Sequence, residues 1–428
     1  MTDDEWGTLM TAANGTTLGI NGLGRIGKLL LWHHVARRDF SRIVVNLGRQ
    51  SGTSLDAVCG VIEQDSTYGP MHRFLFGVTA KPCVHLVHHE EGLLDVGGVP
   101  VTVLQAARNP RNIGWYHHGV RVVVDTTGAF DDPTLPADHA SGSLRGHLEA
   151  GAEKVIHSAA FKIRDRRLGM PDDAVTLIAG INHDAFDVAH HDLISAASCT
   201  TTALAHMLRP LIDRFSAASL MTASMSTVHA ATNSQSVLDT LPATGARDLR
   251  RSRSVLNNII LTSTNAAETL EQVIPEIATV GFMADSVRIP VPTESLAILN
   301  VTMQTTLLPS GESTVTREVL NETYADAEAG PQRGYLVYSE RQNVSTDVSG
   351  MRAAVVIEGA ETHTRTGFVT IDLASIPALV GDQGSHRIPQ RIEIPVTHAK
   401  IFGWYDNEYG SYTNLLGDLS VHVHQALD

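Results

Sequence analysis

The chain has 428 residues, of which 43% are hydrophobic and 18% charged, a globular composition with enough apolar side chains for two or three domain cores. Its formal net charge of −14 argues against a broad surface for nucleic acid or anionic membranes. The three cysteines cannot form a disulfide framework, no run reaches the roughly 18 apolar residues of a spanning helix, and the acidic N-terminus lacks a signal-peptide core. We therefore expect a cytoplasmic protein that binds neither nucleic acid nor membrane.

The N-terminal part of the chain predicts a parallel sheet, after a frayed polar leader of about ten residues. Thr17–Asn21 is a short β-prone run, Lys28–Arg38 predicts a helix, and the run SRIVVNLG completes a βαβ unit. Further apolar runs that end in turn residues predict strands at Val120–Gly128, Glu153–Ala160 and Val175–Asn182. Near-continuous apolar runs are typical of parallel strands that are buried on both faces.

The pattern changes after Cys199. The run TTALAHMLRPLIDRF predicts a helix, and the later runs SLAILNVTMQTTLL and MRAAVVIEG alternate as strands of a mixed or antiparallel sheet do. The stretch from Tyr335 to Pro395 is expected to be loop-rich, with VGDQGSHRIPQ an exposed insertion. The C-terminal tail predicts a helix whose apolar face has no evident partner in this second domain.

A glycine turn follows the first predicted strand. Gly22, Gly24 and Gly27 form a G-x-G-x-x-G pattern between a strand and a helix. The first glycine permits a tight turn, the second allows the backbone to approach a pyrophosphate, and the third allows close packing of helix on strand. In this βαβ context the pattern predicts dinucleotide binding at the helix N-terminus, the alternative being a glycine-rich turn without a ligand.

The end of the second strand bears on the choice of cofactor. A carboxylate that binds the ribose hydroxyls is expected here in NAD enzymes, but the residues are Asn46, Leu47, Gly48 and Arg49. Leu47 cannot accept a hydrogen bond, whereas Arg49 could pair with a 2′-phosphate. The strand end therefore favours NADP over NAD, unless Arg49 is a solvated loop residue.

Cys199 lies at the start of a predicted helix, where exposed N–H groups and the helix dipole favour a thiolate. His229, at the end of an apparent strand, could serve as its basic partner. A buried cysteine is also common as an inert core residue. These two residues alone leave the choice between nucleophile and core open.

Histidines cluster at several positions. A metal site could be formed by Cys83, His85, His88, His89 and Glu90, but no recognised zinc spacing is complete, and we expect a strand with a histidine-rich edge and no metal. Three adjacent pairs are expected to be exposed: His33–His34, His117–His118 and His190–His191.

Several motifs together resemble the phosphorylating glyceraldehyde-3-phosphate dehydrogenases. INGLGRIG, SAASCTTTALAHML, TVHAATNSQSVLD, DLRRSRSVLNNIILTSTNAAE, VRIPVP and WYDNEYG occur in that family's order, from Thr17 to the C-terminus. The resemblance implies an α/β fold with a doubly wound Rossmann domain (residues 1–198 and 407–428) and an α+β catalytic domain (199–406). The C-terminal helix would then return to the first domain.

The resemblance also implies the reaction and its residues. Cys199 would attack an aldehyde, His229 would act as general base, and inorganic phosphate would cleave the thioester. The implied cofactor site, for NAD or NADP, comprises Gly22, Gly24, Arg25, Ile26, Gly27, Asn46, Arg49, Thr127 and Asn407. The implied sites for the substrate phosphate and inorganic phosphate comprise Ser198, Thr200, Thr232, Arg251, Thr264 and Arg288. Arg251 is chosen from the run Arg250, Arg251 and Arg253, which could also be a solvated or subunit-interface patch.

The chain departs from the family pattern near the phosphate sites. Ala196, Thr202 and Ala203 replace two asparagines and a cysteine, and Asn265 and Glu268 stand where glycine and lysine are usual. Alternatives are therefore a paralogue for another phosphorylated aldehyde such as erythrose 4-phosphate, an enzyme that hydrolyses the thioester, or a non-catalytic nucleotide-binding regulator. The family is typically tetrameric, and Ala230–Arg253 resembles its subunit-crossing loop, which predicts a homo-oligomer.

Overall fold

The computed structural model of the chain describes residues 16–50, 52, 54–105, 107–165, 167–242, 244–246, 248–373 and 390–428. Its residue contacts separate two units. Unit 1 contains the chain up to Thr202, together with Ser349–Ala354 and Asp406–Asp428, and unit 2 contains Ala203–Val348 and Val355–Tyr405. None of the helices in the described part of the chain is long and apolar enough to cross a membrane.

Unit 1 is built on a nine-stranded sheet with the order β3-β4-β5-β2-β1-β6-β7-β9-β8. The pairs from β5 through β2, β1, β6, β7 and β9 to β8 are parallel, and the β3-β4-β5 edge is antiparallel. The strands are β1 (Thr17–Asn21), β2 (Arg42–Asn46), β3 (Val84–His88), β4 (Leu93–Val96), β5 (Val99–Leu104), β6 (Val122–Asp125), β7 (Lys154–His157), β8 (Ala174–Thr176) and β9 (Leu193–Ser195).

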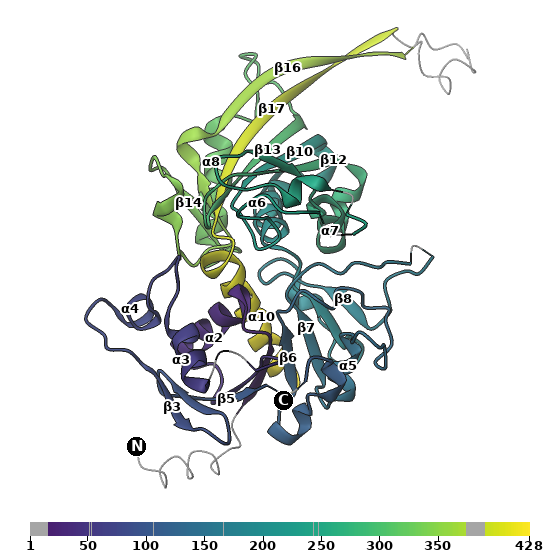
Figure 1. The fold of residues 1–428 in the computed structure, drawn as a ribbon. Coiled ribbons are helices and arrows are strands. Elements are labelled where there is room, and N and C mark those ends of the chain that lie inside the picture. Colours follow the sequence, from purple (N-terminus) through teal and green to yellow (C-terminus); the bar gives the residue numbers. More distant parts are fainter. Residues whose placement is uncertain are drawn as a thin grey trace. The chain divides into compact units, whose positions relative to one another are not determined.

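The helices of unit 1 are α2 (Arg25–Arg37), α3 (Leu55–Glu63), α4 (Met71–Phe76), α5 (Arg145–Glu149) and α10 (Asn414–Gln425). α10, although it ends the chain, lies beside α2 and near β6 in this unit (Figure 1). Its Leu416, Leu419 and Val423 are at most 1% exposed and share one core with the strands and α2. The apolar face of the C-terminal tail is therefore buried against residues from the beginning of the chain.

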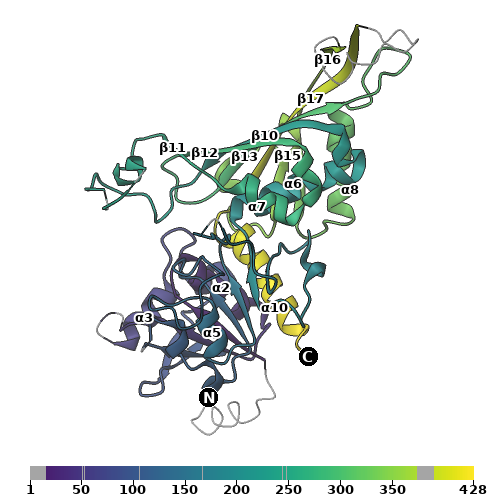
Figure 2. The same cartoon turned by 90° about the vertical axis from the view of Figure 1, so that its right-hand side faces the viewer.

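Unit 2 is built on an eight-stranded sheet with the order β11-β12-β10-β13-β17-β15-β14, in which β16 pairs with β17. α6, α7 and α8 lie along one face of it (Figure 2), and every second residue of β13 is buried. The elements are α6 (Cys199–Phe215, with the residues up to Thr202 in unit 1), β10 (Leu220–His229), β11 (Ile260–Thr262), α7 (Ala266–Val273), β12 (Gly281–Arg288), β13 (Ser295–Gln304), α8 (Arg317–Ala329), β14 (Leu336–Ser339), β15 (Val355–Glu358), β16 (His363–Asp372) and β17 (Arg391–Tyr405).

The predicted fold class is confirmed: a parallel doubly wound sheet in unit 1 and a mixed sheet with helices in unit 2. The loop-rich interpretation of residues from Tyr335 to Pro395 is wrong, because this stretch contains β14, β15, β16 and the start of β17. β16 and β17 pair from His363–Lys400 to Asp372–Arg391 as a long hairpin (Figures 1 and 2). β16 contains Thr, Phe, Val and Ile, which are common in strands, but none of its residues is buried, so it lacks the apolar alternation of a half-buried strand. Most of the expected insertion VGDQGSHRIPQ, and the polar leader, lie outside the described residues.

Two further predictions need correction. The strand expected over Val175–Asn182 ends at Thr176, and the short strand β9, which leads to Cys199, was not expected. His33 and His34 are 1% and 0% exposed rather than an exposed pair, because α10 covers this face of α2. The histidine-rich stretch is confirmed as a strand, β3, with His85 and His88 exposed.

Candidate active site

The glycine turn in unit 1 is shaped by two close approaches. Gly22 has φ +99°, a left-handed conformation that L side chains rarely adopt. A Cβ on Gly27 would lie 2.1 Å from the carbonyl oxygen of Gly22, so only glycine lets α2 begin this close to β1. A Cβ on Gly24, by contrast, would meet no atom within 4 Å. The backbone at Gly24 and the first N–H groups of α2, including those of Arg25 and Ile26, therefore stay accessible to an anion.

The side chain of Arg25 is bound by other residues of the protein. Its guanidinium binds the carboxylates of Asp65 and Glu408, and Lys28 lies 2.7 Å from the same Asp65 carboxylate. Burial alone would raise the pKa of Asp65, but bonds to Lys28, Tyr68 and Arg25 lower it to about 2. Arg25 can thus contribute its backbone to a bound cofactor, while its side chain links the glycine turn to the segment around Glu408.

The carboxyl ends of β1, β2 and β6 meet in a buried hydrogen-bond network. Asn46, 1% exposed, donates to Asn21 (2.8 Å) and to the carbonyl of Ala107 (3.0 Å). Asp125 accepts bonds from Asn21 and from both the backbone and the hydroxyl of Thr127. Asn46 therefore supports the turn from within, whereas Thr127 is held exposed at the strand end. Asp125, which sequence reasoning missed, is signalled by the acidic end of the apolar run VVVD.

Arg49 lines a cavity of about 400 Å³ in unit 1. The other lining residues are glycine or aliphatic: Leu23, Gly24, Leu47, Gly52, Ala57, Val58 and Val61. Arg49 is exposed, and no carboxylate is among the described residues that line this cavity. The cavity thus joins the predicted cofactor turn at Gly24 to the guanidinium at the end of β2.

Cys199 is presented by a strained turn between β9 and α6. Ala197 has φ +56°, and its carbonyl accepts a hydrogen bond from the hydroxyl of Tyr412 (3.2 Å). Ser198 caps the helix, because its Oγ accepts from the backbone N–H of Thr201 at 3.1 Å. Cys199 is therefore the first residue of α6, at the positive end of the helix dipole.

Asn407 contacts the cysteine directly. Its Nδ2 donates to Sγ of Cys199 at 3.7 Å. Asp406 anchors this segment by accepting bonds from Tyr68 (2.7 Å) and from the backbone of Gly350 (2.9 Å) and Gly410 (3.0 Å). A donor beside the sulfur and the start of α6 both stabilise negative charge on it. Ser198 and Thr200 flank this thiol, with Thr200 only 4% exposed.

The candidate residues of unit 2 meet at the ends of β10 and β12, where His229 pairs with Arg288. Arg288 donates to Oγ1 of Thr232 (2.6 Å) and to the carbonyl of Ala230 (3.2 Å). Nδ1 of His229 lies 2.8 Å from that same carbonyl, which can only accept, so Nδ1 carries the hydrogen. Burial, and then the charge of Arg288, lower the pKa of His229 to about 4, so its neutral ring has a lone pair on Nε2.

Two further candidate phosphate residues, Thr264 and Arg251, lie outside the strand ends of β10 and β12. Thr264 precedes α7, and its Oγ1 accepts from the backbone of Ala266 at 3.2 Å. Asn265 has φ −96°, so the loss of glycine here causes no strain. Glu268 adds a carboxylate to the first turn of α7. Arg251 is exposed in the turn Leu249–Ser252, within the loop that resembles the subunit-crossing segment.

Comparison with known proteins gives one consistent family. Residues 16–133 match the glyceraldehyde 3-phosphate dehydrogenase NAD binding domain, and residues 198–373 match the C-terminal domain of the same family. The chain is 34% identical to glyceraldehyde-3-phosphate dehydrogenase 1 of Streptomyces avermitilis over 413 residues, covering 96% of this chain and 99% of the relative. It is 32% identical to glyceraldehyde-3-phosphate dehydrogenase 1 of Bacillus subtilis over 406 residues, covering 95% and 97%.

Proposed function

This chain belongs to the glyceraldehyde 3-phosphate dehydrogenase family, and we propose that it oxidises a phosphorylated aldehyde to an acyl phosphate with NAD(P) and inorganic phosphate. The substrate that we propose first is glyceraldehyde 3-phosphate. The observation that carries the proposal is the environment of Cys199: the first residue of α6, with the amide of Asn407 on its sulfur. An inert core cysteine needs neither feature.

In the proposed reaction, the thiolate of Cys199 forms a bond to the aldehyde carbon as the carbonyl π bond breaks, and the carbonyl oxygen takes a proton from solvent to become the hydroxyl of a thiohemiacetal. Nε2 of His229 then takes the hydroxyl proton while the carbon loses a hydride. The glycine turn at Gly22, Gly24 and Gly27 would hold a nicotinamide cofactor, which would accept this hydride. An oxygen of inorganic phosphate attacks the resulting thioester, which releases the acyl phosphate and regenerates the thiolate.

The contact between Arg288 and Thr232 supports the proposal that the substrate carries a phosphate. A guanidinium bonded to a hydroxyl at 2.6 Å offers a charged and a neutral donor to the same anion. Arg288 is half-buried, which strengthens its attraction for a phosphate relative to an exposed side chain. We propose that this pair binds the substrate phosphate, and that Ser198, Thr200, Arg251 and Thr264 serve the second phosphate.

A second candidate substrate is favoured by Glu268. Its carboxylate in the first turn of α7 lies near Thr264 in the chain and repels an anion there. A paralogue that acts on erythrose 4-phosphate, or one that releases its product by hydrolysis, would be less dependent on a tight inorganic-phosphate site.

The experiment is a steady-state assay with glyceraldehyde 3-phosphate and erythrose 4-phosphate, each with and without inorganic phosphate. We expect the highest kcat/KM with glyceraldehyde 3-phosphate and an acyl phosphate product that requires phosphate. Turnover that is independent of phosphate and yields the free acid would replace the proposal with thioester hydrolysis. Absence of turnover with every aldehyde, while the cofactor binds, would favour a non-catalytic nucleotide-binding protein.

A further inference from the structure

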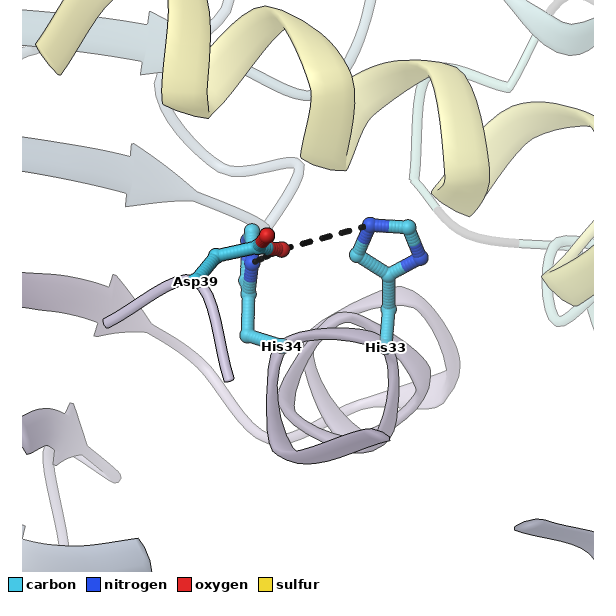
Figure 3. Close-up of side chains that lie close together, drawn as sticks. All are labelled: His33, His34 and Asp39. Atoms are coloured by element: carbon cyan, nitrogen blue, oxygen red, sulfur yellow. Dashed lines mark hydrogen bonds and ion pairs between the residues drawn. The ribbon is translucent and has the colours of Figure 1, made fainter. Parts of the chain in front are cut away.

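A cluster of the buried His33 and His34 with the half-buried Asp39 lies in unit 1, outside the proposed active site (Figure 3). His33 and His34 are on α2, and Asp39 follows its C-terminal end. Nε2 of His33 is 4.0 Å from Oδ2 of Asp39, and Nδ1 of His34 is 3.0 Å from the same oxygen. One donor atom from each residue lies within 4.8 Å of the other two.

Asn414 determines where the hydrogen of His33 resides. Its Nδ2 donates to the carbonyls of Tyr409 (2.7 Å) and Gly410 (2.8 Å), so its Oδ1 is the atom that faces Nδ1 of His33 at 3.0 Å. Because an amide oxygen only accepts, Nδ1 of His33 is the donor. This leaves Nε2 as the ring nitrogen of His33 that can bind an ion.

Nε2 of His33 is buried and has no hydrogen-bond partner among the described residues. It lies 4.0 Å from Oδ2 of Asp39, which is beyond hydrogen-bond distance. That oxygen already accepts from Nδ1 of His34 at 3.0 Å and pairs with Nε of Arg37 at 3.1 Å. An ion that replaces the hydrogen on Nδ1 of His34 would give Nε2 of His33 the partner that it lacks.

We propose that His33, His34 and Asp39 bind a divalent transition-metal ion, with Zn²⁺ as the first candidate. Two imidazoles and one carboxylate, with water as a fourth ligand, are a known zinc set with metal–ligand distances of about 2.0–2.2 Å. Two ligands of one ion therefore lie at most about 4.4 Å apart. The two distances to Asp39, 4.0 and 3.0 Å, meet this limit already. Asn414 supplies the second hydrogen bond that orients a metal-bound histidine.

The carboxylates around the site are shared with arginines. Arg37 binds both Asp39 and Asp418, and Arg352 binds Asp418 as well, so the two acids face two guanidinium groups. Nε of Arg37 lies 3.1 Å from Oδ2 of Asp39, and the Arg37 side chain is 32% exposed. An ion at Oδ2 would therefore displace Arg37 toward solvent, where Asp418 still pairs with it.

The ion would fasten α2 to the C-terminal helix. Gly417 of α10 lies directly over the site, since a Cβ there would come within 2.2 Å of Nε2 of His33. Asn414, one turn earlier on α10, holds the same ring. The role is therefore structural, and it is independent of the proposed catalytic chemistry.

The test measures Zn²⁺ binding and thermal unfolding of the full chain after chelator treatment, with Cys199 alkylated so that its thiolate cannot bind the ion. We expect one Zn²⁺ per chain and a Tm that rises by roughly 5 °C or more at about 100-fold excess over Kd. Asp39→Asn and His33→Gln should abolish both effects. Asp187→Asn is the matched control, because Asp187 also contacts two histidines but lies on the surface. Its carboxylate bonds Nδ1 of His190, and its backbone N–H donates to Nδ1 of His191.

Equal Zn²⁺ binding and Tm shift in wild type and Asp39→Asn, or no Tm rise in the wild type, would overturn the proposal. The proposal would also be overturned if Asp187→Asn lost as much Zn²⁺ binding and Tm shift as Asp39→Asn. If both site variants fail to fold, the test is Co²⁺ binding to the wild-type chain, followed by its visible absorption spectrum. A visible cobalt spectrum that one equivalent of Zn²⁺ displaces supports the site, and the absence of such a spectrum refutes it.

Discussion

At the scale of single residues, the three cysteines are set apart by their surroundings. Burial raises the pKa of Cys59, and burial with Glu63 raises the pKa of Cys83 to about 11. Cys199 instead has the start of α6 and the amide of Asn407. We therefore predict that iodoacetamide at neutral pH labels Cys199 first, as mass spectrometry of digested protein would show. Cys199→Ser should abolish aldehyde oxidation, and full activity in this variant would refute the mechanism.

His229 should remain a base well below neutral pH. Because burial lowers its pKa from 6.5 to about 4, the neutral form that accepts a proton persists as the pH falls through the usual histidine range. The loss of kcat/KM that depends on this residue should therefore centre near pH 4. His229→Asn should slow oxidation by about 10²–10⁴-fold, and its pH profile should lack the fall of kcat/KM that we expect near pH 4 in the wild type. If kcat/KM of the wild type instead falls near pH 6.5, and this fall disappears in His229→Asn, the lowered pKa of His229 is contradicted.

Arg49 tests the cofactor preference. Its guanidinium lines the cavity next to Gly24 and Leu47, where a charge-assisted bond to a 2′-phosphate contributes about 1.5–3 kcal/mol. Arg49→Ala should lower kcat/KM for NADP by about 10- to 150-fold and leave the value for NAD nearly unchanged. Arg38→Ala, a change of another arginine in unit 1, serves as the control. Clear preference for NAD in the wild type, with no effect of Arg49→Ala, would show that this strand end does not select the cofactor.

At the scale of secondary-structure elements, the contact of α2 with β1 depends on Gly27 but not on Gly24. A Cβ on Gly27 would meet backbone at 2.1 Å, so Gly27→Ala must displace α2 and should destabilise unit 1 by about 1–3 kcal/mol. Gly24→Ala meets nothing within 4 Å and should keep the wild-type Tm, but its methyl group should crowd the pyrophosphate and weaken cofactor binding. Calorimetry and cofactor titration separate the two effects. Equal Tm values for both variants would argue against this account of the turn.

At the scale of the whole molecule, we predict a homo-oligomer, with a tetramer expected from the resemblance. The loop that precedes β11, from Val237 to Ile259, exposes large apolar side chains, and Leu241 alone is 93% exposed. Such a patch is costly in water unless another chain covers it. Leu241→Asp should therefore dissociate the oligomer in sedimentation experiments, whereas Leu308→Asp, at a 47% exposed residue outside the loop, should not. A monomeric wild type at micromolar concentration would contradict the prediction.

Local sequence patterns were sufficient for much of unit 1. β1 was predicted with its observed bounds, and the helix after it was predicted from Lys28 rather than Arg25. Apolar runs and glycines constrain a chain through its near neighbours, so these elements can be recognised without the rest of the fold. The same is true of the cysteine at the start of α6, whose helix pattern begins directly after it.

The tertiary structure alone decided the features that depend on distant segments. The burial of His33 and His34 requires α10, nearly the whole chain away, and β16 requires its pairing with β17, because it has no buried face of its own. Asn407 meets Cys199 only because the end of the chain returns to unit 1. The sequence by itself thus determined the fold class and indicated the candidate reactive residues, since both follow from short-range periodicity and motif. Which side chains become buried, paired or strained was decided by contacts that local sequence does not encode.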